Sequence, residues 1–329
     1  MLALLTAFAA TAAAVPAGAD GSTPDTIGIQ LLEAPVNRRD DPRARAYIVD
    51  HLVPGSVIKR RVQVENNTTE QRQVRVYPGG ASVGNGAFLF AEDGKPTELT
   101  TWTRVEPDKV TLKPREKTTV QVTITVPPSA PSGERYGVIW AENPPPPGQD
   151  RIGTASKVGI RMYLDIGFGA ELPSDFVIES VTPARTPEGR PTLIAHVRNT
   201  GARALDMGGN LALTNGPGTP RAGPFPVTLG TTLGQGQSGP VVVHLDRELT
   251  DGPWSVGLTL RSGRVERTVN ATVTFPAVGM GAPVTVSSAD TPMRVVVSAL
   301  GVLALLALSG FLLVRVRHRH RAVRQRKTG

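Results

Sequence analysis

Polar and apolar residues alternate along several stretches of the chain. From residue 120 to residue 126, valine or isoleucine fills every second position, with glutamine or threonine between them. A period of two places the apolar side chains on one face of a β-strand and the polar side chains on the other, so a half-buried strand is predicted here. The same alternation occurs at residues 62–64, 74–76 and 158–166. The chain is therefore predicted to be rich in β-strands from Ile27 onward.

Turn-forming residues separate the predicted strands. Asn85-Gly86 is typical of a tight hairpin turn, and Pro54-Gly55 precedes another strand. Short strands with frequent turns indicate an immunoglobulin-like sandwich, and a second set of them runs as far as Phe275. The predicted fold class is all-β, with two immunoglobulin-like β-sandwiches at residues 26–170 and 174–275, plus a single C-terminal transmembrane α-helix.

Prolines interrupt the pattern at two places. Pro173 lies between the two sets of strands and cannot donate to a β-ladder, so the domain boundary is predicted there. Four consecutive prolines at residues 144–147 are either an interdomain linker in the polyproline II form or a long loop inside the first domain. We favour the loop, because the strand at residues 158–166 needs partners that the preceding sheet offers.

An apolar stretch lies near each end of the chain. Residues 1–19 are predicted to be a signal peptide, because a small apolar stretch ends in Ala17-Gly18-Ala19, an A-x-A-type cleavage site. Twenty residues without a charge begin at Val295 and end at Val314. A helix of that length spans the hydrocarbon core of a bilayer, about 30 Å thick, so this stretch is the predicted transmembrane helix. Residues 276–294 are predicted to form a stalk before it.

Seven cations follow the predicted span as a stop-transfer signal: Arg315, Arg317, Arg319, Arg321, Arg324, Arg326 and Lys327. Because lysine and arginine collect on the cytoplasmic side of a membrane, the tail at residues 315–329 is predicted to be cytoplasmic and the rest extracellular. The protein is accordingly predicted to be a single-pass cell-membrane protein whose tail also meets anionic lipid. The seven cations account for most of the net charge of +8, so the remainder offers no basic face for nucleic acid.

The composition excludes several kinds of chemistry. The chain has no cysteine, which removes disulfides, thiolate metal sites and cysteine nucleophiles. His51, His196 and His244 match no metal-ligand spacing, and Ser238 does not lie in a G-x-S-x-G motif. We predict no catalytic residue, no metal site and no cofactor, and therefore a protein that is not an enzyme. The abundance of arginine, alanine, glycine and proline indicates a bacterial gene.

Three aromatic residues are candidates for ligand contact, because glycans often stack on aromatic rings: Trp102, Tyr136 and Trp140. Trp102 and Trp140 suit a sandwich core equally well, and we favour the core for them. The sequence does not identify the binding face.

Several fold motifs of the first predicted domain resemble those of a known family. They lie at residues 47–55, 62–67, 102, 110–114, 120–127, 133 and 137–139. Their arrangement resembles the peptidoglycan-binding-type domain of the WxL-interacting protein family of Gram-positive bacteria, over about half the chain. Members of that family also resemble this chain in having a signal peptide, two immunoglobulin-like domains, one C-terminal helix and a basic tail. The resemblance implies peptidoglycan and other surface proteins as ligands.

The function predicted from the sequence is that of a membrane-anchored bacterial cell-surface binding protein, attached to peptidoglycan or to partner surface proteins. One alternative is a chaperone or assembly factor for surface subunits, which predicts strand donation at an exposed sheet edge. A less favoured alternative is a surface hydrolase that uses His51 and Asp50.

Overall fold

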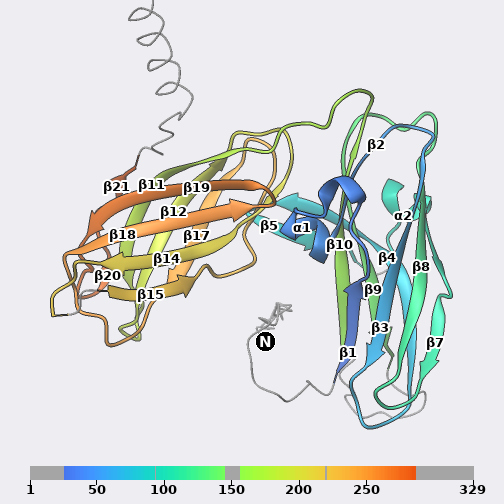
Figure 1. Ribbon diagram of the computed structural model, residues 1–329, viewed down its shortest axis with the longest axis horizontal. Helices are drawn as coiled ribbons and strands as arrows, with labels where there is room; N and C mark the ends of the chain where they lie inside the picture. The colour runs from blue at the N-terminus through green and yellow to red at the C-terminus, as the bar shows by residue number, and fades with distance from the viewer. Residues whose placement is uncertain (1–25, 93, 145–155, 219–220, 287–329) are drawn as a thin grey trace, which may run out of the picture. The chain divides into compact units, whose positions relative to one another are not determined.

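The computed structural model describes residues 26–286, apart from residue 93 and residues 145–155 and 219–220 (Figure 1). The described chain is all-β, as predicted, with three short helical segments. These are a 3₁₀ turn and two α-helices: η1 (Val36–Arg38), α1 (Pro42–Ala46) and α2 (Glu98–Trp102). Side chains cap both α-helices: Asp41 accepts from the Arg43 amide, and Thr97 accepts from the Thr100 amide.

Two sheets enclose the first core. One has the order β1-β3-β8-β6, and the other has the order β2-β10-β9-β4-β5, with β7 also paired to β4. Their bounds are β1 (Ile27–Leu31), β2 (Ile48–Leu52), β3 (Val57–Asn66), β4 (Arg72–Gly84), β5 (Ala87–Phe90), β6 (Thr103–Glu106), β7 (Lys109–Leu112), β8 (Lys117–Thr125), β9 (Gly133–Asn143) and β10 (Ser156–Ile166). The alternating residues predicted from the sequence supply the core: Val120, Val122 and Ile124 of β8 are all 0% exposed.

The proline run connects two neighbouring strands of one sheet. β9 precedes the run and β10 follows it, and the two pair antiparallel along all of β10. Because β10 belongs to the first set of sheets, its apolar side chains lie in the first core beside those of β8.

A second pair of sheets encloses a separate apolar core around the buried ring of Trp254. One has the order β17-β12-β11-β20, with β21 also paired to β11, and the other has the order β15-β14-β18-β19. Their bounds, with those of the short β13–β16 pair, are β11 (Phe176–Arg185), β12 (Pro191–Asn199), β13 (Leu205–Asp206), β14 (Gly208–Thr214), β15 (Arg221–Pro226), β16 (Thr232–Leu233), β17 (Ser238–His244), β18 (Trp254–Ser262), β19 (Val265–Val273), β20 (Gly279–Met280) and β21 (Val284–Thr285).

Part of the segment predicted as a stalk contains short strands. β20 and β21 lie within residues 276–294, yet both pair with β11. Val286 after them is 9% exposed and packs into the second core. Two-residue bridges need no alternating run of apolar residues, so a glycine- and proline-bearing segment can form them without a strand signal in the sequence.

A buried asparagine organises one end of the first sandwich. Asn66 ends β3, and its Nδ2 donates to the carbonyl oxygens of Glu70, Leu112 and Lys113 at 2.8, 3.1 and 3.0 Å. Its Oδ1 accepts from the amide of Thr68 at 3.0 Å. One side chain therefore ties the end of β3 to the turn between β7 and β8.

The second sandwich repeats this arrangement. Asn199 ends β12, and its Nδ2 donates to the carbonyl oxygens of Arg203, Leu233 and Gly234 at 2.7, 3.0 and 3.0 Å. Its Oδ1 accepts from the amide of Gly201 at 2.9 Å. The pattern is the same as around Asn66. In both places the side-chain amide donates to the carbonyl four residues ahead and to two consecutive carbonyls of a later turn, and the side-chain oxygen accepts from the backbone amide two residues ahead.

The turns that supply those carbonyls also match. Glu116 accepts from the amide of Lys113 at 2.7 Å, and Gln237 accepts from the amide of Gly234 at 3.0 Å. Each turn also contains one residue with a left-handed backbone, with φ of 61° at position 115 and 70° at position 236. The two sandwiches therefore share this asparagine-centred arrangement, and their strand orders make β10, beside β9, correspond to β19, beside β18.

We predict that Asn66→Ala and Asn199→Ala each lower the free energy of unfolding by about 2–3 kcal/mol, because each leaves buried carbonyl groups without a donor. Urea denaturation followed by circular dichroism measures the change. Asn270→Ala on the exposed face of β19 is the matched control, for which a change within about 0.5 kcal/mol is expected. A change that small in either buried variant would show that the asparagine does not stabilise its sandwich.

We also predict that two fragments, residues 26–170 and 174–286, fold separately, because each contains a complete apolar core. Circular dichroism of the two purified pieces should show β-structure and a cooperative melt in each. Limited proteolysis of the whole chain should cut near exposed Pro173. Fragments that are unfolded on their own would contradict the predicted division into two domains.

Candidate binding edge and domain junction

β10 is paired on both sides over only half of its length. β9 accompanies it from Ser156 to Ile166, whereas β2 runs parallel to it only from Met162 to Ile166. On the side opposite β9, no strand of the described chain pairs with residues 156–161. This stretch, called the open edge below, lies next to β1 (Figure 1), which is hydrogen-bonded to β3 of the other sheet.

The open edge has an apolar inner side. Ile160 is 3% exposed and Val158 is partly buried against the first core. Arg161 and Gly159 are on the opposite, outer face, because successive side chains of a strand point to opposite sides. The hydrogen-bonding side of a strand that borders no other strand, beside an apolar strip, is the surface to which another strand adds.

Two other edge strands of the molecule carry proline. β15 contains Pro224 and Pro226, and β17 contains Pro240. Proline has no N–H to donate and is a usual means of blocking strand addition. β10 contains no proline, so the open edge lacks this protection.

The ring of Trp140 crosses the outer face of the sheet beside the open edge. It lies over Gly79 of β4 at one end and over Gly159 of β10 at the other. Phe90 packs against it with ring centroids 4.8 Å apart. The ammonium group of Lys157 lies 4.4 Å from its centroid. Trp140 is partly exposed on the surface and is not part of the buried core predicted for it.

The other two predicted aromatic residues lie elsewhere. Trp102, at the end of α2, packs against the first core, as favoured from the sequence. Tyr136 packs with Phe88 and Tyr163 in a small cluster on the outer face of the sheet. Its hydroxyl donates to Glu134 at 2.7 Å, and burial together with the charge of Glu134 raises the pKa of the tyrosine. The structure therefore does not bring the three residues together into one site.

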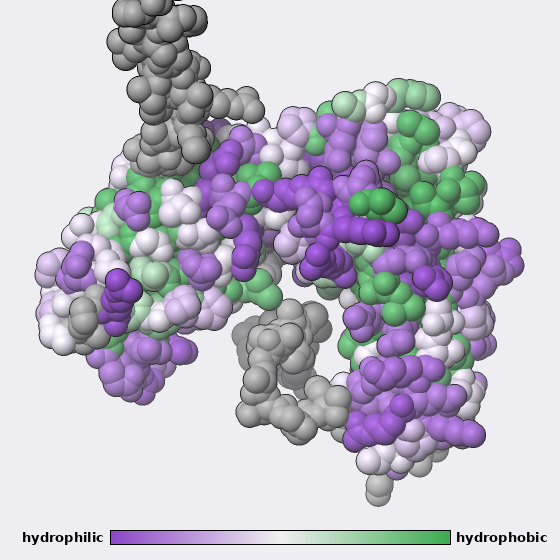
Figure 2. Space-filling model, in the orientation of Figure 1, coloured by the Kyte–Doolittle hydropathy of each residue, from purple (hydrophilic) through white to green (hydrophobic). Residues whose placement is uncertain are grey.

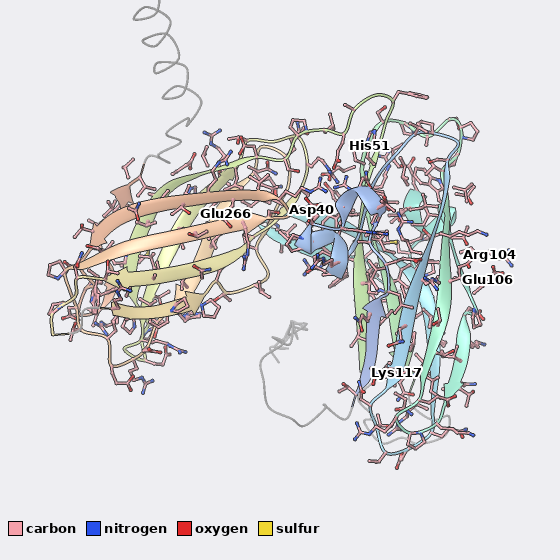
Figure 3. All side chains as sticks on the ribbon, in the orientation of Figure 1. Asp40, His51, Arg104, Glu106, Lys117 and Glu266 are labelled. Carbon is pink, nitrogen blue, oxygen red and sulfur yellow. The ribbon has the colours of Figure 1, made fainter. Side chains whose placement is uncertain are left out.

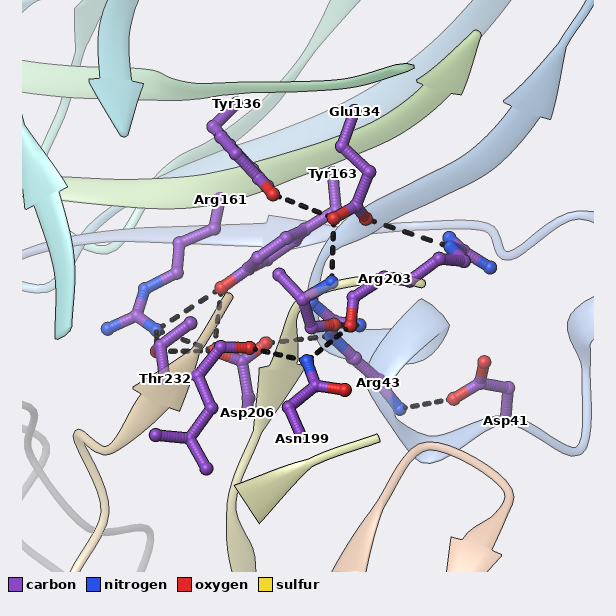
Figure 4. Close-up of polar contacts among 12 residues, drawn as sticks. Asp41, Arg43, Glu134, Tyr136, Arg161, Tyr163, Asn199, Arg203, Asp206 and Thr232 are labelled. Carbon is purple, nitrogen blue, oxygen red and sulfur yellow. Dashed lines mark hydrogen bonds and ion pairs between the residues drawn. The ribbon is translucent and has the colours of Figure 1, made fainter. Parts of the chain in front are cut away.

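The aromatic cluster ends at a carboxylate from the second sandwich (Figure 4). Asp206 accepts from the Tyr163 hydroxyl at 2.6 Å, from Thr232 at 2.8 Å, from Arg43 at 2.7 Å and from Arg161 at 3.1 Å. Burial alone would raise the pKa of the Asp206 carboxyl, but the charges of Arg43 and Arg161 and the hydrogen bond from Tyr163 outweigh it and lower the pKa. Asp206 is thus held as a carboxylate.

Further ion pairs surround this contact. Glu171, in the segment between β10 and β11, pairs with both Arg38 and Arg203, and Arg43 donates to the carbonyl of Ala204 at 2.7 Å. Figure 2 shows hydrophilic side chains gathered over α1 and its surroundings. A depression of about 210 Å³ lies among them, lined by residues including Arg38, Glu171 and Arg203. Its charges are paired with one another, so the structure assigns these groups to holding the two sandwiches together.

The residues of the hydrolase alternative are not brought together. His51 and Asp50 are neighbours on β2 and therefore point to opposite faces. His51, labelled in Figure 3, lies 2.9 Å from Asp165 and 3.1 Å from the Gly169 carbonyl. Asp50 accepts from Arg60 at 2.5 Å, although burial raises the pKa of its carboxyl. Both residues are thus engaged in structural pairs, and the described residues hold no group of three potential metal ligands.

Comparison with known proteins gives fold neighbours only. No family model and no curated protein matches the chain. Among solved structures, the SafA pilin–SafB chaperone complex of Salmonella enterica matches at 11% identity and a TM-score of 0.37, over 79% of this chain and 95% of that chain. The Pseudomonas aeruginosa CupB2 chaperone matches at 12% identity and a TM-score of 0.36, over 70% and 97%. The Acinetobacter baumannii CsuC–CsuE complex of a chaperone with a tip adhesion subunit matches at 13% identity and a TM-score of 0.36, over 68% and 94%.

The resemblance to the WxL-interacting protein family is corrected by these findings. No family model matches the chain, so no model of that family does. The motifs that suggested the family are strand and turn motifs, which unrelated sandwiches share. Peptidoglycan as a ligand was implied by that resemblance and is withdrawn with it.

The predicted localisation is corrected as well. Within the part of the chain that the structure describes, no helix is long and apolar enough to cross a membrane. The prediction of a single-pass cell-membrane protein is therefore not upheld. The signal peptide at residues 1–19, the span from Val295 to Val314 and the seven tail cations lie outside the described residues.

We predict that Asp206→Asn lowers the free energy of unfolding by about 2–4 kcal/mol at pH 7, because it leaves Arg43 and Arg161 buried without their counter-charge. The pKa of Asp206 is lower in the folded state, so its stabilising contribution is complete above the unfolded-state pKa of about 3.9 and is lost as the pH falls through the folded-state pKa. The difference between wild type and variant should shrink below about pH 4.

Urea denaturation between pH 7 and pH 3 measures this difference. Asp251→Asn is the matched control, because Asp251 is 63% exposed in its pair with Arg185 and an exposed pair contributes at most about 1 kcal/mol. An Asp206→Asn variant as stable as wild type at pH 7 would show that the carboxylate does not hold the junction.

Proposed function

We propose that this protein is an assembly factor, or chaperone, for bacterial surface-protein subunits, and that it holds an extended segment of its client as an additional strand on the open edge. The observation that carries the proposal is the incomplete pairing of β10, whose residues 156–161 have β9 on one side and no described strand on the other. Strand addition of this kind uses main-chain hydrogen bonds for affinity and alternate side chains for specificity.

Three features support the open edge as the binding site. Its inner side continues the apolar core through Val158 and Ile160, so a client strand with alternating apolar residues would extend an existing core. It lacks the prolines that β15 and β17 carry. The paired half of the same strand contains Tyr163 and Asp165, which bond to Asp206 and His51, so this half is held in place before a client binds.

A client of this kind is a subunit whose own sheet lacks a strand. Such a subunit exposes an apolar edge that aggregates unless it is covered. The chaperone strand covers that edge until the subunit is assembled. This proposal includes two expectations from the sequence. The partner is a surface subunit, and the protein catalyses no reaction.

Disulfide cross-linking tests the proposal directly, because the chain contains no cysteine of its own. The probe is a short synthetic peptide of alternating valine and threonine with one cysteine, and dissolved oxygen with a copper–phenanthroline catalyst is the oxidant that joins the two thiols. We expect Lys157→Cys on the open edge to cross-link at least about tenfold faster than Thr123→Cys on β8, because pairing raises the effective concentration of the peptide thiol. Thr123 is the matched control, since Lys59 of β3 and Arg104 of β6 flank it on both sides.

A cysteine on a second edge strand distinguishes strand addition at the open edge from strand addition at any sheet edge. Thr268→Cys lies on β19, the equivalent strand of the second sandwich and also an edge. Mass spectrometry of the three cysteine variants, with and without excess cysteine-free peptide, gives the rates. Equal rates at positions 157 and 123 would contradict binding at the open edge, and equal rates at positions 157 and 268 would show that the site is not particular to β10.

A further inference from the structure

The position of Trp140 depends on two glycines. A Cβ atom at Gly79 would lie 2.4 Å from the ring Nε1, and a Cβ atom at Gly159 would lie 2.6 Å from the ring Cε3. Either contact is too short for a real side chain, so the ring lies flat across β9 only because both neighbouring strands carry glycine there. The six-membered part of the indole thus reaches over β10 towards the open edge.

Gly159 leaves a gap on the outer face of the open edge. It is exposed, and its neighbours on that face, Lys157 and Arg161, are two residues away on either side. The Arg161 guanidinium lies 4.9 Å from the ring of Phe88, and the Lys157 ammonium lies 4.4 Å from the ring of Trp140. Both cations are drawn over rings of this sheet, and the position between them has no side chain of its own.

A strand added to the open edge would place one side chain opposite Gly159. Directly opposed residues have Cβ positions about 4.5–5.5 Å apart, so a long side chain reaches across the missing one. It would meet the edge of the Trp140 ring over Gly159, with a cation on either side. An aromatic ring is the side chain that gains most at this position, through edge contact with the indole and through cation–π contact with Lys157.

We propose that Trp140 is a specificity-determining residue of the open edge, and that it selects a client strand with an aromatic residue opposite Gly159. This inference rests on the proposed function, since it requires that a client strand occupies the open edge. It specifies the side chains of the client strand, which main-chain hydrogen bonds do not select. These are alternating apolar residues on one side of the strand and one aromatic residue on the other.

A guest-position series tests the inference. The probes are synthetic peptides of alternating valine and threonine in which one threonine after another is replaced by phenylalanine, tyrosine, alanine or aspartate. Fluorescence anisotropy gives their dissociation constants for the full chain. We expect one guest position at which an aromatic residue binds about three- to tenfold tighter than alanine. Trp140→Ala should bind the alanine peptide as wild type does and lose the aromatic preference at that position.

Two further variants separate specificity from stability. Phe90→Ala removes a ring that packs against Trp140 from β5, on the side of the sheet away from β10, and should keep the preference. Gly159→Ala should displace the indole and lose the preference while Trp140 is still present. Thermal melts of all three variants show whether each is folded. If one of them is unfolded, the decision rests on the other two.

The outcomes distinguish the two proposals. Peptides that bind with no aromatic preference, or a preference that survives Trp140→Ala, overturn the role of Trp140 and leave strand binding intact. Peptides that fail to bind at all, with no cross-link at position 157, overturn the proposed function and the inference with it. Loss of the preference in Phe90→Ala as well as in Trp140→Ala would assign Trp140 to stability and would also overturn its role in specificity.

Discussion

A β-strand has two hydrogen-bonding sides, and β10 is satisfied on both of them only from Met162 to Ile166. The arrangement of β1, β2 and α1 beside β10 is linked to where that pairing stops. β2 covers the second half of β10, and the chain before β2 turns away through α1, so that β1 pairs with β3 in the opposite sheet instead of continuing along β10. Backbone groups left unpaired in this way are costly to bury, so such an edge must meet solvent or another strand.

The two halves of β10 are also different chemically. The paired half contributes Tyr163 to the contact with Asp206 and Asp165 to the contact with His51. Those contacts need charged groups at low exposure, which are stable only when every partner is present. The other half contains Val158 and Ile160 on its inner side, and its Gly159 lies under the ring of Trp140 on the outer face. Arg161 stands at the division and bonds to Asp206 while its guanidinium lies over Phe88. The fixed half of β10 and the proposed binding half therefore lie side by side in one strand.

The sequence predicted the features that depend on neighbouring residues. The alternation at residues 120–126 and 158–166 identified β8 and β10, because burial of every second side chain is a local pattern. Asp206 gave no such signal, because its partners Tyr163 and Arg43 are 43 and 163 residues away. The repeated asparagine motif was missed for another reason: its acceptors are backbone carbonyls, and the matching turns at residues 113–116 and 234–237 share little sequence. Gly159 was visible as a glycine within a strand, which often marks the close approach of another group, but the ring that approaches it is known only from the pairing of β9 with β10.

The two sandwiches give an internal comparison for the open edge. β10 and β19 occupy equivalent places, each beside the strand that precedes it and each near the first strand of its sandwich. On β19 the outer side chains are Glu266, Thr268, Asn270 and Thr272, all exposed and polar. On β10 the corresponding face has the glycine gap with an indole over it. The two sandwiches thus share the buried asparagine that ties each fold together and differ at this face. This difference supports the proposal that a client binds the first sandwich, and it does so independently of the strand pairing of β10.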